Sequence, residues 1–418
     1  MVKKTDRCAF CGRSARDVRL LITGLDACIC DECVAQASNV VATTFQEEGQ
    51  QFPSSASKSA KSQVPGLDLR SLPKPSDITA FLDQYVIGQD DAKRYLAVAV
   101  YNHYKRILQP HDDNNVEIEK SNVIMVGPTG TGKTLMARTI AKMLRVPFTI
   151  VDATVFTEAG YVGEDVESIL TRLLQVADFD QAATERGIVF IDEIDKIARK
   201  ADNPSITRDV SGEGVQQGLL KLLEGSIVNV PPKGGRKHPD QDYIHIDTHN
   251  ILFICGGAFD GIERKIAQRL NTHVVGYNSV QRVAHIDKDD LLKYVQPQDL
   301  KSFGLIPEII GRLPVLTHLD PLDRKALRAI LTEPKNSLIR QQQKLFEMDG
   351  IKLTFTDEAL EYMVDKAVEF KLGARGLRGI VESIMITPQY ELPAKHVKKF
   401  TVDLDFAKSQ MEKSTIAT

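Results

Sequence analysis

The 418-residue sequence predicts an α/β main domain with a small cysteine-rich unit in front of it and a smaller, mainly helical domain behind it. Three observations predict this division. Five of the six cysteines lie within residues 8–33. Short apolar runs alternate with helical patterns from about Ser76 onward, as in sheets of parallel strands. Beyond about Pro321 helical patterns dominate. The length agrees with two or three domains of roughly 150 residues.

The composition is that of an ordinary folded protein. Hydrophobic residues make up 42% and charged residues 26%, which excludes a wholly disordered or collagen-like chain. The sequence has no run of about 18 apolar residues and no signal-peptide pattern at its start, so we expect a cytoplasmic protein without a membrane partner. Lys and Arg number 53 against 56 Asp and Glu, and this net charge of −3 argues against a protein whose whole surface grips nucleic acid.

The first unit, residues 1–48, has the spacing of a zinc site. Two C-x-x-C pairs are separated by 18 residues, and their members are Cys8, Cys11, Cys30 and Cys33. In a reducing compartment such a cluster favours metal over disulfides. Four thiolates close a tetrahedral shell, so we expect a structural Zn²⁺ that stabilises a unit with little core of its own. Cys28 and Cys255 are expected to lie outside this site.

The rest of the chain divides by composition. Residues 49–75 are rich in Ser, Lys, Gln and Pro and predict a flexible linker. We expect the large α/β domain over 76–319, the small domain over 320–406 and a tail over 407–418.

The elements follow from hydrophobic periodicity. In the large domain we expect a helix at 90–108 and buried strands at 122–126, 148–151, 187–191 and 250–254. Helical stretches between these strands indicate a parallel sheet. In the small domain we expect helices at 323–331, 335–348, 357–370 and 375–385 and a strand at 399–404.

A phosphate-binding motif joins the first buried strand to a helix. It fits G-x-x-x-x-G-K-[ST] at every fixed position, and its residues are Gly127, Pro128, Thr129, Gly130, Thr131, Gly132, Lys133 and Thr134. Backbone N–H groups of such a loop close around phosphates at a helix N-terminus. We expect Lys133 to reach the β- and γ-phosphates, Thr134 to ligate Mg²⁺ and Leu135 to complete the nucleotide site. The alternative is a glycine-rich turn that binds nothing.

An acidic pair closes the strand at 187–191. Asp192 is expected to hold Mg²⁺ through water, and Glu193 to orient the water that attacks the γ-phosphate. Taken alone, two carboxylates after an apolar strand also fit a helix N-cap, but the preceding P-loop favours catalysis. Asp195 and Lys196 follow and are expected to be surface or interface charges.

Two arginines stand in contexts that suit phosphoryl transfer, which needs positive charge near the γ-phosphate. Arg312 lies where the α/β pattern ends, and Arg375 opens a late helix. From spacing alone, a surface or structural arginine remains the alternative for each.

With these motifs in this order, the sequence resembles the AAA+ ATPases from Cys8 to about residue 405, and within them the protein-unfolding subunits of two-component proteases. The resemblance implies a AAA+ P-loop ATPase domain, a small mainly helical C-terminal domain and an N-terminal zinc-binding module. It implies a homo-hexameric ring in which Arg312 is the arginine finger for the neighbouring subunit's nucleotide. Arg375 would be the sensor-2 residue, and Val86 and Ile87 would line the base pocket.

The resemblance also implies substrate loops. Tyr161 and Val162, between Gly160 and Gly163, match the first pore loop, whose tyrosine grips translocating polypeptide; a buried-core role is the alternative from sequence alone. The stretch 202–211 with Arg208 resembles the second pore loop. The basic entrance loop is matched by Arg236, Lys237 and His238, for which a solvated charge run is the alternative. An apolar loop suits polypeptide, whereas nucleic acid favours Lys or Arg.

One segment departs from the family pattern. Where the family carries Ile-Gly-Phe on the loop that docks a ClpP-like peptidase, this chain has Val275, Gly276 and Tyr277, in a region that also looks shorter than usual. The tyrosine hydroxyl needs a hydrogen-bond partner in an apolar cleft.

These features together predict an ATP-dependent unfoldase that passes polypeptides, some delivered by adaptor proteins, into a ClpP-like peptidase. Two alternatives remain open. A chaperone of the same build would work without a peptidase, and a AAA+ DNA remodeller would use its zinc module on nucleic acid. Near-neutral charge and the aromatic loop count against the second alternative.

Overall fold

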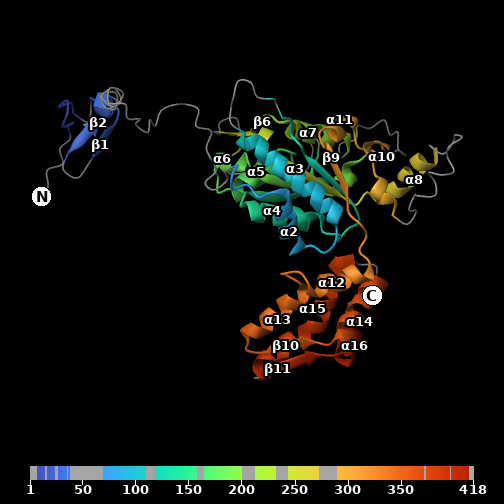
Figure 1. Cartoon of the computed structure of the whole chain (residues 1–418). Helices are drawn as coiled ribbons and strands as arrows, with labels where there is room; N and C mark the ends of the chain where they lie inside the picture. The colour runs from blue at the N-terminus through green and yellow to red at the C-terminus, as the bar shows by residue number, and fades with distance from the viewer. Residues whose placement is uncertain are drawn as a thin grey trace. The chain divides into compact units, whose positions relative to one another are not determined.

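The computed structural model describes residues 7–14, 17–23, 27–34, 36–37, 69–109, 116, 118–157, 164–199, 212–231, 243–272, 290–370, 373–395 and 397–413. The chain divides into two compact units, residues 1–63 and 64–418, and each is described by itself (Figure 1).

The first unit contains a short antiparallel pair of strands. β1 (Leu21–Thr23) pairs with β2 (Cys28–Cys30), and Leu21 lies opposite Cys30. Among the described residues of this unit, the buried hydrophobic side chains are those of cysteines: Cys8, Cys28 and Cys30. So little buried apolar surface stabilises a fold weakly, and this favours a metal as the missing source of stability.

The described residues of the second unit form a five-stranded parallel sheet of strand order β4-β5-β8-β3-β9. Its strands are β3 (Val123–Val126), β4 (Phe148–Asp152), β5 (Ile188–Asp192), β8 (Leu252–Gly257) and β9 (Val315–His318). The sheet confirms the predicted α/β class and the four expected strands. Strand β9 was missed because Thr317 and His318 interrupt its apolar pattern, although the strand pairs fully with β3.

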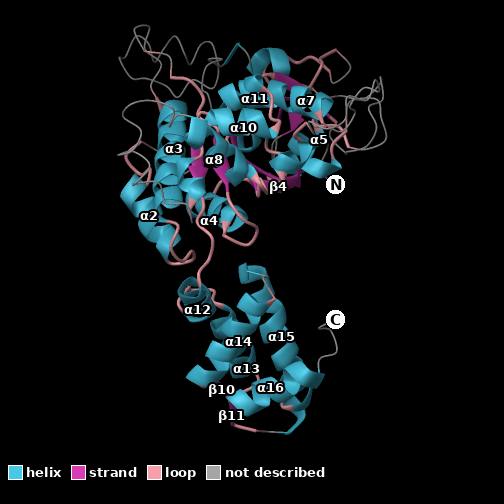
Figure 2. Ribbon diagram, turned by 90° about the vertical axis from the view of Figure 1, so that its right-hand side faces the viewer, coloured by secondary structure: helices cyan, strands magenta, loops and turns pink. Residues whose placement is uncertain are grey.

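Helices cover both faces of the sheet (Figure 2). Successive residues of a strand point to opposite faces, and apolar residues on both faces of β3 pack into two separate cores. Val123 and Met125 belong to one core, and Ile124 and Val126 to the other. The first core includes residues of α2 (Pro75–Asp83), α3 (Asp90–Leu108) and α4 (Lys133–Leu144). The second includes residues of α5 (Ser168–Val176), α7 (Glu213–Glu224), α8 (Ile262–Thr272), α10 (Pro297–Phe303) and α11 (Pro307–Gly311).

Shorter elements lie between these. They are α6 (Gln181–Thr184), the antiparallel strands β6 (Ile227–Val230) and β7 (Ile244–Asp247), and the 3₁₀ turns η1 (Ala153–Val155), η2 (Ile194–Ile197), η3 (Thr248–Asn250) and η4 (Leu291–Tyr294).

The C-terminal subdomain, residues 324–413, has its own hydrophobic core. Its elements are α12 (Arg324–Thr332), α13 (Leu338–Met348), β10 (Lys352–Phe355), α14 (Asp357–Glu369), α15 (Gly373–Glu391), η5 (Pro393–Lys395), β11 (Lys399–Val402) and α16 (Leu404–Lys413). Helix α16 crosses residue 406, where we expected the folded part to end. Ala407 is buried in the core, so a tail that starts at residue 407 is wrong, and the folded region reaches Lys413.

A single side chain ties the start of α3 to the segment before α12. Gln89 is buried and adopts a left-handed backbone conformation, with φ of 62°. Its amide nitrogen donates to the Asp320 carbonyl at 2.8 Å, and its amide oxygen accepts from the Asp320 N–H at 2.8 Å. The side chain of Gln89 therefore provides hydrogen-bond partners for both the N–H and the carbonyl of Asp320.

Replacing Gln89 by alanine is expected to lower the free energy of unfolding by about 2 kcal/mol, because two backbone groups of Asp320 lose their partners. The thermal unfolding midpoint of residues 64–418 should drop by several degrees. Gln298→Ala in α10, where the glutamine side chain is exposed, is the matched control and should leave the midpoint unchanged. Equal midpoints for the two variants would show that the Gln89 bridge adds nothing.

Candidate functional site

The glycine-rich loop lies between β3 and α4, and its backbone requires glycine. Gly130 and Gly132 have φ of 81° and 107°, which disfavour any side chain. A β-carbon at Gly127 would lie 2.8 Å from the Leu319 carbonyl oxygen, so the loop also packs too closely for alanine. Helix α4 begins at Lys133, directly after the loop. The loop therefore presents backbone N–H groups at the N-terminus of a twelve-residue helix, as a phosphate site needs.

Lys133 folds back into this loop. Only 7% of the residue is exposed, and its ammonium donates to the carbonyls of Gly127 at 2.6 Å and Pro128 at 2.9 Å. Burial lowers the pKa of Lys133, and the charge of Arg375 lowers it further, whereas Asp192 and Asp195 raise it. The ammonium has carbonyl partners inside the phosphate loop, and phosphate oxygens are stronger acceptors for it.

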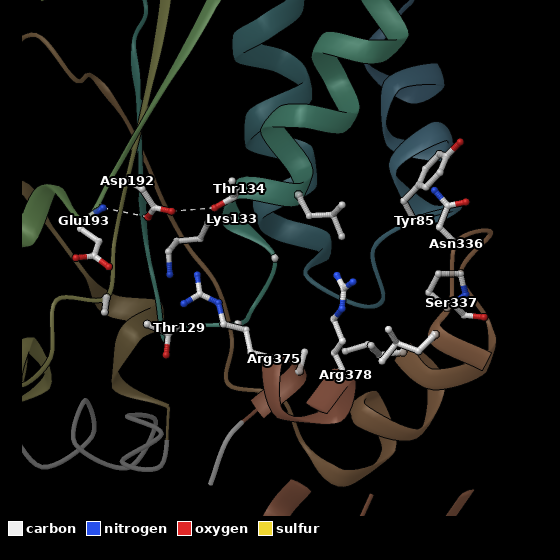
Figure 3. A pocket seen from close by; sticks show the side chains of 18 of the residues that line it. Tyr85, Thr129, Lys133, Thr134, Asp192, Glu193, Asn336, Ser337, Arg375 and Arg378 are labelled. Carbon is white, nitrogen blue, oxygen red and sulfur yellow. Dashed lines mark hydrogen bonds between the residues drawn. The ribbon is translucent and has the colours of Figure 1, made fainter. Parts of the chain in front are cut away.

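The acidic pair stands at the end of β5, where Asp192 is the last strand residue and Glu193 follows it. Thr134 Oγ1 donates to Asp192 Oδ2 at 3.0 Å, and the Glu193 N–H donates to Asp192 Oδ1 at 3.0 Å (Figure 3). Glu193 has a left-handed backbone with φ of 57°, a conformation of some cost to a residue with a β-carbon. A hydroxyl and a carboxylate at hydrogen-bond distance are oxygen ligands of the kind that Mg²⁺ prefers.

A cavity of about 450 Å³ joins these groups to the C-terminal subdomain. Lys133, Thr134, Asp192 and Glu193 line it, and so does Arg375 from the first turn of α15. Figure 3 shows Arg375 beside Lys133, at the side of the cavity that the C-terminal subdomain forms. Thr129, Gly130, Gly132 and Leu135 line the cavity as well. The structure therefore brings together nine of the residues that we predicted for nucleotide binding and hydrolysis.

Several lining residues escaped the sequence analysis. Tyr85, Asn336, Ser337 and Arg378 line the cavity (Figure 3). Tyr85 directly precedes the predicted pair Val86 and Ile87, and Arg378 lies three residues after Arg375, whereas Asn336 and Ser337 belong to no motif. The predicted base-pocket residues Val86 and Ile87 are not among the lining residues. Val86 is buried in the core, and its Cγ1 would lie 3.6 Å from a β-carbon at Gly132.

Asp195 is also part of the cavity wall, and its predicted surface position is wrong. Only 6% of the residue is exposed. Its Oδ1 accepts from the Ala258 N–H at 3.2 Å, and its Oδ2 lies 3.3 Å from the Lys196 ammonium. These two partners allow the carboxylate to be buried. The Ala258 N–H is within reach because Ala258 follows β8, which lies next to β5 in the sheet. The charge of Asp195 raises the pKa of Lys196.

Arg312 lies apart from this cavity. It follows α11, and its side chain is 51% exposed. Its Nε and Nη2 lie 3.1 Å and 2.9 Å from Oε1 of Glu224, the last residue of α7. Among the residues that line the nucleotide cavity, Arg312 is absent.

The four predicted zinc ligands come together in the first unit. One sulfur from each of Cys8, Cys11, Cys30 and Cys33 lies within 4.8 Å of all the others. The Cys30 N–H donates to Cys8 Sγ at 3.2 Å. Backbone hydrogen bonds, chiefly from Cys11, lower the pKa of the Cys8 thiol to about 6, whereas burial raises the pKa of the Cys33 thiol, as expected of neighbouring thiols that cannot all ionise without a cation between them.

The remaining cysteines lie outside this cluster, as predicted. Cys28 is in β2 and is buried, and Cys255 is in β8. Burial raises the pKa of the Cys255 thiol to about 12, so it stays protonated.

Comparison with known proteins agrees with this arrangement. Residues 118–316 match the AAA domain (Cdc48 subfamily), residues 322–401 the C-terminal, D2-small domain of ClpB protein, and residues 6–43 the ClpX C4-type zinc finger. Similar relatives, each named ATP-dependent Clp protease ATP-binding subunit ClpX, come from three bacteria. The Bacteroides thetaiotaomicron protein is 68% identical over 415 residues, which cover 99% of this chain and 98% of the relative. The chain belongs to the ClpX family.

Two further relatives with the same name match this chain over a similar length. The Bacteroides fragilis protein is 69% identical over 98% of this chain and 97% of its own length. The Porphyromonas gingivalis protein is 65% identical over 98% of both chains. This chain is thus an ATPase that uses ATP and Mg²⁺, and it carries a structural Zn²⁺ site of four cysteines.

The substrate and docking loops predicted for this chain lie outside the described residues. These are Gly160 to Gly163 with Tyr161 and Val162, Arg208, the basic residues Arg236, Lys237 and His238, and the segment Val275, Gly276 and Tyr277. Their flanks are described. Thr157 N–H donates to the Glu164 carbonyl at 3.2 Å across the first loop, and β6 and β7 flank the basic loop. Among the described helices, none has the length and apolar character of a membrane span.

Proposed function

We propose that this chain is an ATP-driven unfoldase, which forms a hexameric ring and threads polypeptides through the central pore into a ClpP-like peptidase. The observation that carries the proposal is the separation of Arg312 from the cavity that holds Lys133, Asp192, Glu193 and Arg375. An exposed arginine that is absent from its own chain's site suits a group offered to the site of a neighbour. The names of the ClpX relatives, which describe subunits of an ATP-dependent protease, support the same conclusion.

In the proposed reaction each residue has one task. Lys133 binds the β- and γ-phosphates, and Thr134 and Asp192 supply oxygen atoms toward Mg²⁺. When bound, Mg²⁺ neutralises charge on the phosphate oxygens. Glu193 orients a water molecule toward the γ-phosphate and accepts its proton. Arg375 contacts the nucleotide from the C-terminal subdomain, and Arg312 of the neighbouring subunit stabilises negative charge as the phosphoryl group leaves.

Closure of the C-terminal subdomain on the nucleotide couples this chemistry to motion in our proposal. Arg375 and Arg378 come from α15, whereas Lys133 begins α4 and Glu193 directly follows β5. A nucleotide that bridges the two sets of residues favours one relative position of the sheet and the C-terminal subdomain. Hydrolysis removes part of that bridge, and the loops around Tyr161, Arg208 and the basic loop at Arg236 would transmit the motion to a polypeptide. The zinc module would receive adaptors and some substrates.

The test mixes the purified chain with a ClpP-like peptidase, ATP and a folded protein that carries a degradation tag. Degradation that requires ATP hydrolysis supports the proposal. ATP-dependent remodelling of the substrate without degradation supports the chaperone alternative, which the departure at Val275, Gly276 and Tyr277 favours. DNA-stimulated ATP hydrolysis with steeply salt-dependent DNA binding would support a DNA remodeller instead.

Tyr161→Ala is expected to retain at least half of the ATPase rate and to lose most translocation, because the residue contacts polypeptide and not nucleotide in this proposal. Tyr95→Ala, which removes an exposed tyrosine from α3, is the matched control and should unfold substrate normally. The measurement is the rate of substrate unfolding per ATP hydrolysed. An unchanged ratio in Tyr161→Ala would remove the pore-loop assignment.

A further inference from the structure

The last turn of helix α7 contacts the side chain of Arg312 directly and reaches its backbone through Asn122. The Arg312 guanidinium lies against Glu224 Oε1 through Nε at 3.1 Å and Nη2 at 2.9 Å. Its carbonyl accepts a hydrogen bond of 2.9 Å from the side-chain amide of Asn122. The same Asn122 nitrogen donates to the Leu223 carbonyl at 3.2 Å. The last turn of α7 therefore fixes the arginine directly and through a buried amide.

The same helix also fixes the segment that leads into α11. Gln216, in the first half of α7, is fully buried. Its amide oxygen accepts from the Ile306 N–H at 2.8 Å, and Ile306 is the N-cap of α11. Its amide nitrogen donates to the carbonyls of Ile197 at 2.8 Å and Gly304 at 3.3 Å. Both ends of the short helix before Arg312 are thus anchored to α7.

The contact with Glu224 leaves one edge of the Arg312 guanidinium free to bind a further group. Both short contacts involve the Nε–Nη2 edge, and Nη1 has no hydrogen-bond partner among the described residues. A guanidinium has two such edges that match paired oxygen atoms, so one edge can hold Glu224 while the other reaches a phosphate. This geometry orients the arginine without occupying all of its donors.

The ion pair has little value as a source of stability. The Arg312 side chain is 51% exposed and that of Glu224 is 41% exposed. Exposed pairs of this kind contribute roughly 0–1 kcal/mol to folding. Orientation has a larger effect on catalysis, because a charged donor stabilises a transition state only from a defined position near the developing charge.

We propose that Glu224 is a positioning residue for Arg312, and that α7 holds the arginine ready for the nucleotide of the neighbouring subunit. This inference rests on the proposed function, in which Arg312 acts between subunits. The residues before α7 include the stretch 202–211, which we expect to form the second pore loop. Helix α7 thus links that part of the chain to the arginine that the next ATP site uses.

Glu224→Ala is expected to lower kcat for ATP hydrolysis about tenfold and to change KM for ATP by less than about twofold. The loss is partial because Arg312 remains present and loses only its orientation, whereas complete loss of an arginine finger lowers kcat by a factor on the order of 10³ or more. Glu224→Gln keeps an acceptor oxygen and should lie between wild type and alanine. Glu213→Gln, which affects an acid of the same helix paired with Arg199 at 3.0 Å, is the control and should keep kcat. Thermal midpoints should stay equal in all four proteins.

Mixed rings separate the action of Glu224 on its own site from its action on the neighbour. Chains with Arg312→Ala keep an intact pocket, and chains with Glu193→Gln keep an intact arginine. A mixture of the two should hydrolyse ATP faster than either alone. Adding Glu224→Ala to the Glu193→Gln chains should remove most of this gain, whereas adding it to the Arg312→Ala chains should not.

The outcomes of the mixing experiment are distinct. A gain that survives Glu224→Ala in the arginine-donating chains overturns the positioning role and leaves the proposed function intact. Absence of any gain in the original mixture overturns the action of Arg312 between subunits, and the positioning role falls with it.

Discussion

Replacing Glu193 by glutamine is expected to reduce ATP hydrolysis at least about 100-fold while ATP still binds. The glutamine keeps the size and the backbone conformation of the residue, but it is not basic enough to accept a proton from water, and positioned acid–base groups contribute roughly 10²–10⁴-fold. Thr134, Asp192 and Lys133 are untouched, so the phosphate and metal contacts remain. Nucleotide affinity is measured by titration with a fluorescent ATP analogue, and hydrolysis by phosphate release.

Glu358→Gln is the matched control for this experiment, because Glu358 is an exposed acid in the first turn of α14. It should hydrolyse ATP like the wild type. A Glu193→Gln variant that hydrolyses ATP within twofold of the wild type would show that another group activates the water. Loss of ATP binding in that variant would show instead that Glu193 contributes to the binding site and not to the chemical step alone.

Replacing Cys30 by serine is expected to abolish zinc binding and to unfold the first unit. The unit has little buried apolar surface in its described part, and structural zinc sites supply about 10–16 kcal/mol of apparent binding energy. ATP hydrolysis should remain near the wild-type rate, because the nucleotide cavity belongs entirely to the second unit. Zinc content is measured by metal analysis, and unfolding by rapid proteolysis within residues 7–37.

Cys28→Ser tests the choice of ligands. Cys28 lies two residues from Cys30 but outside the four-sulfur cluster, so this variant should keep one zinc ion per chain. Loss of zinc from Cys28→Ser together with retention in Cys30→Ser would reverse the assignment of the ligands.

The sheet was predictable because its strands are buried on both faces. Strands β3, β5 and β8 are continuous apolar runs, and such runs stand out from amphipathic helices in sequence. Strand β9 lies at the edge of the sheet and includes Thr317 and His318, so its pattern is weaker. Helix α16 was missed, and a tail was predicted from residue 407, because this stretch is largely polar in sequence. Only its packing on the core shows that Ala407 is buried.

The chemical groups of the nucleotide site were predictable where one motif holds them together. Lys133 and Thr134 end a single sequence motif and begin α4, and Asp192 and Glu193 are adjacent in sequence. Asn336 and Ser337 could not be found in this way, since only the folded chain brings their segment to the cavity, whereas Tyr85 directly precedes the predicted pair Val86 and Ile87. The position of Asp195 was predicted wrongly because charged side chains are usually exposed. Its burial depends on a partner, the Ala258 N–H, that only the folded chain brings to it. Glu224 gave no signal at all, since its importance depends on where Arg312 lies.

The central claim is that ATP hydrolysis at this cavity unfolds proteins, and the loss of native fluorescence from a tagged, folded fluorescent protein tests it most directly. A trap for unfolded protein is added so that refolding does not hide the reaction. We predict that fluorescence falls with the wild-type chain and ATP, and persists with a non-hydrolysable ATP analogue or with Glu193→Gln. Persistent fluorescence while the wild-type chain hydrolyses ATP would contradict the claim.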